Sequence, residues 1–242
     1  MALATLDMLN GIFSIIFVSI STIVGLIVAF KYFKYKKPIF LYMGLTWVLI
    51  VSPWWASSVS ILVAITTSND EGLSLGMYLL VGNIMMPLYM IFIVASITEF
   101  TNKDWQRIGF IITLIIGILF EIYLCYFLFV NPSEMGTKKG VVDIEFSGFL
   151  RLYLIINIFL ALIAGIVIAR ISHRSENPEV RLKGGFILIA TLIWVVGAIF
   201  DGFLTLNVLT LTIIRLVLIS SSIFFYFGFF TPNWLKNHFI KE

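Results

Sequence analysis

Long apolar runs separated by short polar segments extend along most of the chain. Each run has roughly 20 residues or more, the length that an α-helix needs to cross the hydrocarbon core of a bilayer. The runs predict seven transmembrane helices, and the residues after them form a short amphipathic tail. The pattern therefore predicts an all-α, polytopic membrane protein with a single seven-helix domain. The predicted helices span about 11–30, 39–66, 75–100, 108–130, 148–171, 185–206 and 209–230, and the tail spans 231–242.

Two of these predicted helices contain a proline near the middle. Pro53 lies in the second helix beside two tryptophans, and Pro87 lies near the centre of the third. Proline has no backbone N–H, so we expect a kink at both positions. Broken helices at membrane depth often border cavities, but proline is also common in ordinary membrane helices. Both interpretations remain open at this stage.

The composition narrows the class of protein. Apolar residues make up 60% of the chain and charged residues 12%, whereas soluble domains have about 45–50% and about 25%. With a mean hydropathy of +1.06, no soluble domain is expected, and a nucleic-acid-binding role is excluded because no soluble fold carries a basic face. Cys125 is the single cysteine, which rules out an intrachain disulfide. No metal site is predicted, and the lipid bilayer is the expected partner.

Lysine and arginine are distributed unevenly between the two sets of loops. They concentrate after the first, third and fifth predicted helices and in the tail. The opposite loops contain only Lys138 and Lys139, which are offset by Glu134, Asp143 and Glu145. Because positively charged loops stay in the cytoplasm, we expect the N-terminus outside and the C-terminus in the cytoplasm of a multi-pass protein of the cell membrane.

Four charged side chains fall at similar depth in four different predicted helices. Counted from the presumed outer ends, Asp201 lies roughly 8 Å deep, Arg215 roughly 9 Å, Glu121 roughly 13 Å and Arg151 roughly 5 Å, at a rise of about 1.5 Å per residue. Their charges sum to zero, so they are able to pair away from lipid. We expect Asp201 to pair with Arg215 and Glu121 to pair with Arg151.

Three interpretations of these charges remain open. In the first, they form structural pairs that lock neighbouring helices together. In the second, they line an outward-facing polar cavity for a small ligand, with tryptophans as its walls. In the third, arginines reach the membrane interface without a partner, as the shallow Arg151 is able to do. The candidate ligand-binding residues are Glu121, Arg151, Asp201, Arg215, Asn83, Asn157, Trp54, Trp55 and Trp194.

The segment VVDIEF at 141–146, in the loop after the fourth predicted helix, alternates apolar and acidic residues. Such alternation is typical of a short strand. We expect either a strand here or a lid over the outer face of the bundle.

The last predicted helix and its exit, IIRLVLISSSIFFYFGFFTPNWLK at 213–236, resemble the end of the heptahelical sensor regions of prokaryotic histidine kinases. The topology alone also resembles that of rhodopsin-like proteins, but the seventh helix has no lysine to form a Schiff base, so neither retinal nor another cofactor is expected. The resemblance implies a sensor. Because the sequence ends at Glu242 without a kinase domain, we expect a stand-alone sensor that signals through a separate cytoplasmic or membrane partner.

A small-solute transporter of the heptahelical type is the alternative hypothesis. Its midplane site would use the two kinked helices, although no internal repeat is visible. An enzyme is not expected, because the sequence contains no pairing of serine with histidine, no zinc motif and no shared aspartate pair. No catalytic residue is therefore predicted.

Overall fold

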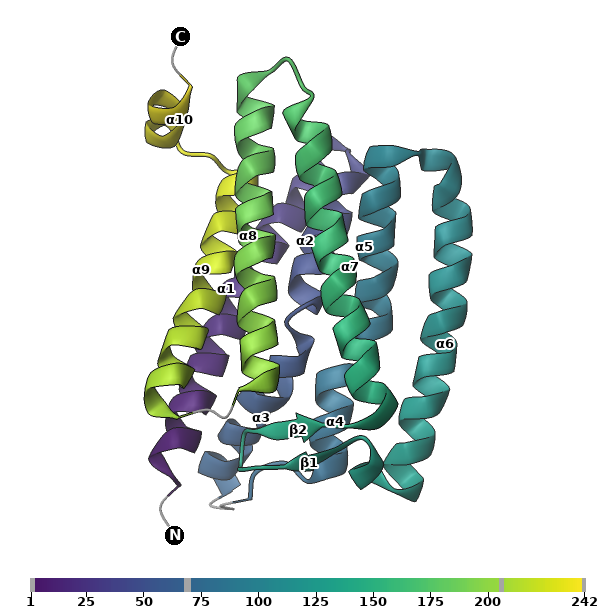
Figure 1. Cartoon of the computed structure of the whole chain (residues 1–242), viewed down its shortest axis with the longest axis vertical. Helices are drawn as coiled ribbons and strands as arrows, with labels where there is room; N and C mark the ends of the chain where they lie inside the picture. The colour runs from purple at the N-terminus through teal and green to yellow at the C-terminus, as the bar shows by residue number, and fades with distance from the viewer. Residues whose placement is uncertain (1–2, 68–70, 205–206, 241–242) are drawn as a thin grey trace.

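The computed structural model describes residues 3–67, 71–204 and 207–240, which form a bundle of helices with a small β-hairpin at one end (Figure 1). The helices are α1 (Thr5–Tyr35), α2 (Pro38–Leu49), α3 (Ser52–Thr67), α4 (Leu75–Asn83), α5 (Met86–Thr101), α6 (Gln106–Val130), α7 (Gly148–His173), α8 (Pro178–Phe203), α9 (Val208–Phe229) and α10 (Asn233–Phe239). Two 3-10 turns, η1 (Lys103–Trp105) and η2 (Pro132–Glu134), and two strands, β1 (Gly136–Lys138) and β2 (Ile144–Phe146), complete the described elements.

Six stretches of the described chain are helical, long and apolar enough to cross a membrane. They are α1, α4 with α5, η1 with α6, α7, α8 and α9, and the bent pair of α2 and α3 would be a seventh. Six to seven such helices indicate a polytopic membrane protein, which confirms the predicted class. The described chain begins and ends at opposite ends of the bundle (Figure 1). The count of seven spans and the orientation in the membrane remain predictions.

The helix boundaries agree with the apolar runs to within a few residues, with three differences. The first helix is longer than the predicted 11–30, since α1 starts at Thr5. The sixth starts earlier, at Pro178, because its first turn is polar and capped by the Asn177 side chain; its predicted end at 206 lies outside the described residues. In the predicted tail, α10 covers Asn233–Phe239, while 241–242 lie outside the described part.

The second and third predicted helices are each broken at the predicted proline. Proline clashes with the carbonyl four residues earlier, and α2 ends at Leu49, four residues before Pro53. In the same way α4 ends at Asn83, four residues before Pro87. Both prolines lie in the first turn of the next helix, where no backbone N–H is needed. The first predicted kink is confirmed, since α3 is bent by 47° from α2. At Pro87 the helix is interrupted, but α4 and α5 together count as a single span.

The two breaks lie side by side in the bundle. Ser52 follows the first break and Met86 follows the second, and the Ser52 hydroxyl donates to the Met86 sulfur at 3.4 Å. Both residues are buried. Two irregular backbone segments therefore meet inside protein and away from lipid, where such segments are tolerated.

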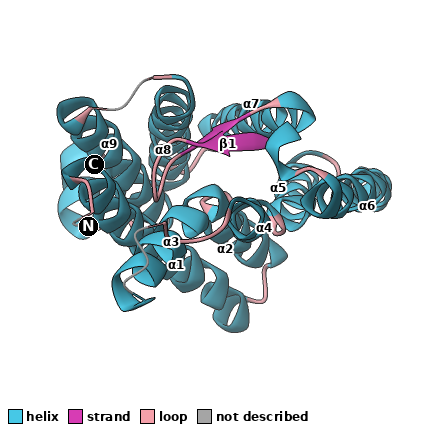
Figure 2. Ribbon diagram, turned by 90° about the horizontal axis from the view of Figure 1, so that it is seen from below, coloured by secondary structure: helices cyan, strands magenta, loops and turns pink. Residues whose placement is uncertain are grey.

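The loop between α6 and α7 forms an antiparallel hairpin. Gly136 pairs with Phe146 and Lys138 pairs with Ile144. Figure 2, which views the bundle from its lower end, shows the strands crossing that end beside α7. The strand predicted within 141–146 is confirmed for 144–146.

Helices α1 and α2 approach each other closely through glycine. A Cβ at Gly44 would collide with the backbone of Ala29 and with the carbonyl oxygen of Gly25. Small residues at such a contact let two membrane helices pack at short range. Helix α2 also contacts α9 through aromatic rings, since Trp47 of α2 stacks on Phe225 of α9 with centroids 4.0 Å apart.

Candidate functional site

Asp201 and Arg215 form an ion pair inside the bundle, as the sequence predicts. Asp201 lies in the last turn of α8, and Arg215 lies in the second turn of α9, after the chain reverses direction. The Asp201 Oδ2 and Arg215 Nη1 atoms are 3.2 Å apart, and the arginine side chain is only 2% exposed. The confirmed pair keeps both charges away from lipid.

Two further helices bind to this pair. Asn10 of α1 accepts a hydrogen bond from Arg215 Nη2 through its Oδ1 at 2.7 Å. Trp54 of α3 donates its indole N–H to Asp201 Oδ2, also at 2.7 Å. Hydrogen bonds to charged groups are the stronger ones, so this network ties α1, α3, α8 and α9 together.

The network is not saturated. Asp201 Oδ1 and Arg215 Nε are buried and have no hydrogen-bond partner within the described residues. An ionised carboxylate accepts several hydrogen bonds and a guanidinium donates five. Two polar groups of the network therefore remain available for a further partner.

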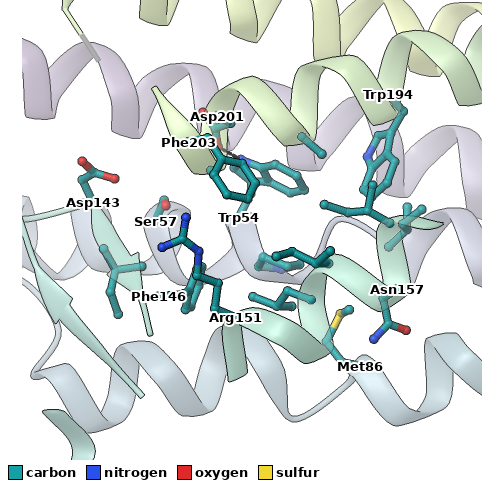
Figure 3. A pocket seen from close by; sticks show the side chains of 18 of the residues that line it. Trp54, Ser57, Met86, Asp143, Phe146, Arg151, Asn157, Trp194, Asp201 and Phe203 are labelled. Carbon is teal, nitrogen blue, oxygen red and sulfur yellow. Dashed lines mark hydrogen bonds between the residues drawn. The ribbon is translucent and has the colours of Figure 1, made fainter. Parts of the chain in front are cut away.

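A cavity of about 120 Å³ adjoins the network. Figure 3 shows it from close by, with side chains contributed by several helices and by the hairpin. Its wall contains Pro53 and Met86, so both helix breaks border it. Of the predicted site residues, the cavity brings together Trp54, Arg151, Asn157, Trp194, Asp201 and Arg215.

The hairpin covers this cavity with Val142, Asp143, Ile144 and Phe146. It is fastened to α3 and α4 mainly through side-chain hydroxyl groups. The hydroxyl groups of Ser57 and Tyr78 both donate to the Val142 carbonyl, at 3.0 and 2.9 Å. A few residues away, the Ser60 hydroxyl donates to the Val141 carbonyl at 2.5 Å. The hairpin is thus held over the cavity at specific points.

Lys138 of β1 adds a second attachment. Its ammonium group donates to the carbonyl oxygens of Glu71 and Leu73, at 2.6 and 2.7 Å. Burial is the main cause that lowers the pKa of this lysine. Lys138 therefore connects the hairpin to the residues just before α4.

Two charged side chains of the cavity lack an ion-pair partner within the described part of the chain. Asp143 is partly buried under the hairpin, and its burial, followed by the negative charge of Asp201, raises the pKa of its carboxyl group. Arg151 of α7 places its guanidinium over the Phe203 ring, 4.7 Å from the centroid. Its neighbour Glu145 is already paired with Lys139 outside the cavity, at 2.9 Å.

The predicted pairing of Glu121 with Arg151 is wrong. Glu121 lies half-buried in a separate apolar hollow between α5 and α6, next to Pro87 and Cys125. Arg151 instead faces the cavity and Phe203. The two side chains have similar depth, but depth does not determine which face of a helix a residue occupies.

Asn83 and Trp55 also lie outside the cavity wall. Asn83 is fully buried and donates to the Leu79 carbonyl of its own helix at 2.8 Å. Trp55 points away from its neighbour Trp54, as adjacent residues of a helix do, and its buried indole N–H has no hydrogen-bond partner among the described residues.

Sequence reasoning missed two residues of the site. Asn10 precedes the start predicted for the first helix and was not considered; it belongs to α1 because that helix begins at Thr5. Asp143 was counted only as a loop charge, and the alternation gave no signal for it, because an extended strand would place Asp143 on the same face as Glu145, outside the cavity.

The bundle of long apolar helices indicates an integral membrane protein, and a cavity with several charged and polar side chains in its wall lies under the hairpin. Within the described residues, no three side chains of histidine, cysteine, aspartate or glutamate come together as metal ligands. Comparisons with family models, with curated proteins and with solved structures gave no match.

Proposed function

We propose that the chain is a sensor or receptor-like membrane protein that binds a small ligand in the cavity beneath the hairpin. The observation that carries the proposal is the cavity itself. Its wall contains tryptophans and two charged groups that form no ion pair with a described residue, and the hairpin covers it. Concave, mainly apolar sites with a few converging polar groups are typical of ligand binding. The positive-inside bias would place this end of the bundle outside the cell, so the ligand would arrive from outside.

The helix breaks offer a route from the cavity to the other end of the bundle. Pro53 and Met86 line the cavity, and α2 and α5 continue from these breaks toward the opposite end. A ligand that binds better to one arrangement of the breaks shifts the population toward it. The loops at that opposite end are short, so the signal would pass to a separate cytoplasmic or membrane partner.

The test measures the distance between two helix ends, at the end of the bundle opposite the hairpin, before and after a ligand binds. Spin labels at Thr101 and Arg174, both exposed at the end opposite the hairpin, would report the distance between α5 and α7 after the exposed Cys125 is replaced by serine. In a sensor, a compound that binds the cavity changes this distance. A bound compound that leaves the distance distribution unaltered would contradict the proposal.

A small-solute transporter is the second candidate, favoured by the contact between the two breaks at Ser52 and Met86. Broken helices that meet at a site are a feature of many transporters. Purified protein in liposomes separates the two functions, because a transporter accumulates a labelled solute and a sensor does not. If a compound that binds the cavity accumulates in the liposomes, the transporter function is supported and the sensor function is contradicted.

A further inference from the structure

We infer that the ligand of the cavity is a small zwitterion, a molecule that carries one ammonium group and one carboxylate group a few bonds apart. The inference rests on the proposed function, since it names the class of ligand for the same site. It follows from the charges that line the cavity, from their existing partners and from the space between them (Figure 3).

Four charged side chains line the cavity: two form an ion pair with each other, and two form no ion pair with a described residue. Arg215 is neutralised by Asp201, and the pair is held from both sides by Asn10 and Trp54. The other two groups, one acidic and one basic, form no ion pair with any described residue. They come from different elements, because the acidic group belongs to the hairpin and the basic group to α7.

Asp143 is the acidic group. It forms no ion pair with any described residue. The charges around it are mixed: beyond the larger effect of burial, the carboxylates of Asp201 and Asp7 raise its pKa and Arg215 lowers it. Asp143 in turn contributes to the raised pKa of Lys139. A charge that is largely removed from water needs a partner of opposite sign. An ammonium group of a ligand would supply that partner and would also reach the vacant Oδ1 of Asp201 if it lay between the two acids.

Arg151 is the basic group. Its guanidinium rests on the face of the Phe203 ring, an arrangement that leaves its N–H groups directed sideways. A guanidinium recognises a carboxylate with two parallel hydrogen bonds. In Figure 3 this side chain and Asp143 extend toward the same region from opposite sides.

A ligand with one charge would leave one of these two groups without a partner, and a neutral ligand would leave both. A zwitterion offers an opposite charge to both, to the partly buried Asp143 and to the exposed Arg151 at the edge of the cavity, and adds no net charge. Trp194 supports a polar ligand independently, because this residue lines the cavity and its buried indole N–H has no hydrogen-bond acceptor among the described residues.

The size of the cavity limits the ligand further. Its volume of about 120 Å³ is somewhat below that of a cavity that admits benzene, roughly 150 Å³. The ligand therefore has about as many non-hydrogen atoms as benzene, roughly six, as in an amino acid with a short side chain. Peptides and nucleotides are too large. The apolar part of the ligand would contact Trp54 and Trp194, whose rings lie edge to face with centroids 6.2 Å apart.

The experiment uses the full chain in lipid nanodiscs and compares zwitterions with analogues that lack one charged group. The probes are L-alanine, L-valine, β-alanine and γ-aminobutyrate, with ethylamine and propionate as the analogues of L-alanine, and isobutylamine and isovalerate as those of L-valine. Binding is measured by calorimetry and by the shift of the unfolding temperature. At least one zwitterion is expected to bind, and ten or more times more tightly than an amine or a carboxylate alone.

Variants connect the binding to the cavity. Asp143→Asn and Arg151→Gln should each weaken the zwitterion at least tenfold, whereas Arg151→Lys, which keeps the charge, should weaken it less. The matched controls are Glu145→Gln, on the outer face of the same hairpin, and Arg170→Gln, at the far end of the same helix; both should bind as the parent does. Size-exclusion profiles identify any variant that does not fold. If Arg151→Gln does not fold, Arg151→Lys, which keeps the positive charge, still tests the role of the guanidinium.

Three results would overturn the inference: no binding by any zwitterion, binding by an amine or a carboxylate as tight as by its zwitterion, or binding unaffected at both Asp143 and Arg151. Failure of the ligand class differs from failure of the proposed function. Suppose that a single-charge probe binds through Arg151 and changes the distance between the labelled helix ends. This result would support the sensor function and contradict the inference that the ligand is a zwitterion. A zwitterion that binds and accumulates in liposomes would support the ligand class and contradict the sensor function.

Discussion

Trp54 and Trp55 are neighbours in the sequence, but only Trp54 forms a hydrogen bond through its indole N–H. That group donates to Asp201 at 2.7 Å, whereas the N–H of Trp55 is buried without an acceptor in the described part of the chain. A rotation of about 100° around the helix axis, the step between adjacent residues, thus separates a tryptophan that lines the cavity from one that does not. The two positions provide a matched pair of substitutions.

Trp54→Phe should destabilise the protein more than Trp55→Phe does. Both substitutions remove similar apolar area, but only the first removes a hydrogen bond to a charged group, which contributes about 1.5–3 kcal/mol. Unfolding of the purified variants in detergent, followed by circular dichroism against temperature or added denaturing detergent, measures the difference. Equal losses at the two positions would show that the hydrogen bond contributes nothing beyond packing.

Breaking the ion pair between Asp201 and Arg215 should lower the yield of folded protein. Arg215→Leu and Asp201→Asn each leave a buried group without its partner, at a cost of about 3–5 kcal/mol. The double variant should lose less than the sum of the two. Lys103→Gln, which removes an exposed pair with Glu99, is the control and should change stability by no more than about 1 kcal/mol. Harmless single substitutions, judged by monodisperse yield, would refute the importance of the pair.

Gly44→Ala should weaken the packing of α1 on α2. The added methyl group has no space between the Ala29 backbone and the Gly25 carbonyl, and overpacking of this kind costs about 1–3 kcal/mol. Gly76→Ala is the control, because its Cβ would meet no atom closer than 3.9 Å and alanine favours the helix. Thermal unfolding should therefore shift in opposite directions for the two variants.

Ser57→Ala should loosen the hairpin over the cavity. The substitution removes a hydrogen bond to the Val142 carbonyl, which keeps its bond from Tyr78, so we expect a loss of about 1 kcal/mol and roughly fivefold faster amide exchange in 141–146. Ser58→Ala removes only a bond within α3, to the Trp54 carbonyl, and should leave that exchange unchanged. Hydrogen–deuterium exchange read by mass spectrometry measures both variants.

Asp143 should make the stability of the ligand-free protein depend on pH. Its pKa in the folded protein is raised above the ordinary value of 3.8, so the native state holds the proton more firmly than the unfolded chain does. Stability then falls as the pH rises from below that value through the raised pKa, and this contribution does not change further at higher pH. Asp143→Asn removes the contribution.

The unfolding temperature of Asp143→Asn, relative to the parent, should accordingly be higher at pH 8 than at pH 4. Glu145→Gln serves as the control, since the pKa of that exposed carboxyl is lowered by Lys139 and its effect has the opposite sign. A difference between Asp143→Asn and the parent that stays constant over this pH range would show that the carboxyl is not perturbed.

Hydrophobic patterning was sufficient to predict the helices, because each apolar run has the length of a membrane span. The positions of Pro53 and Pro87 predicted both breaks, since a missing N–H and a steric clash are local effects. The ion pair of Asp201 with Arg215 was also predictable, because a short connection brings the ends of α8 and α9 together. These successes depend on local chemistry or on neighbours in the chain.

The errors concern rotation about the helix axis. Counting residues gives the depth of Glu121 and Arg151, but the face on which each side chain lies depends on how α6 and α7 pack, which the sequence pattern does not contain. Asn10 and Asp143 were missed for a related reason. Asn10 lies just before the first apolar run, and Asp143 lies in the loop between two runs; only the folded bundle brings Asn10 next to Arg215 and Asp143 over the cavity.

Helix α6 stands at the margin of the bundle. Only 22% of its most apolar stretch is buried by the rest of the protein, compared with 39–44% for the other unbent spans. Its lipid-facing isoleucines and leucines should therefore exchange freely for one another, whereas insertion or deletion of a residue should not be tolerated. Because the hairpin follows α6 in the chain, a change in the length of this helix should shift the hairpin relative to the cavity.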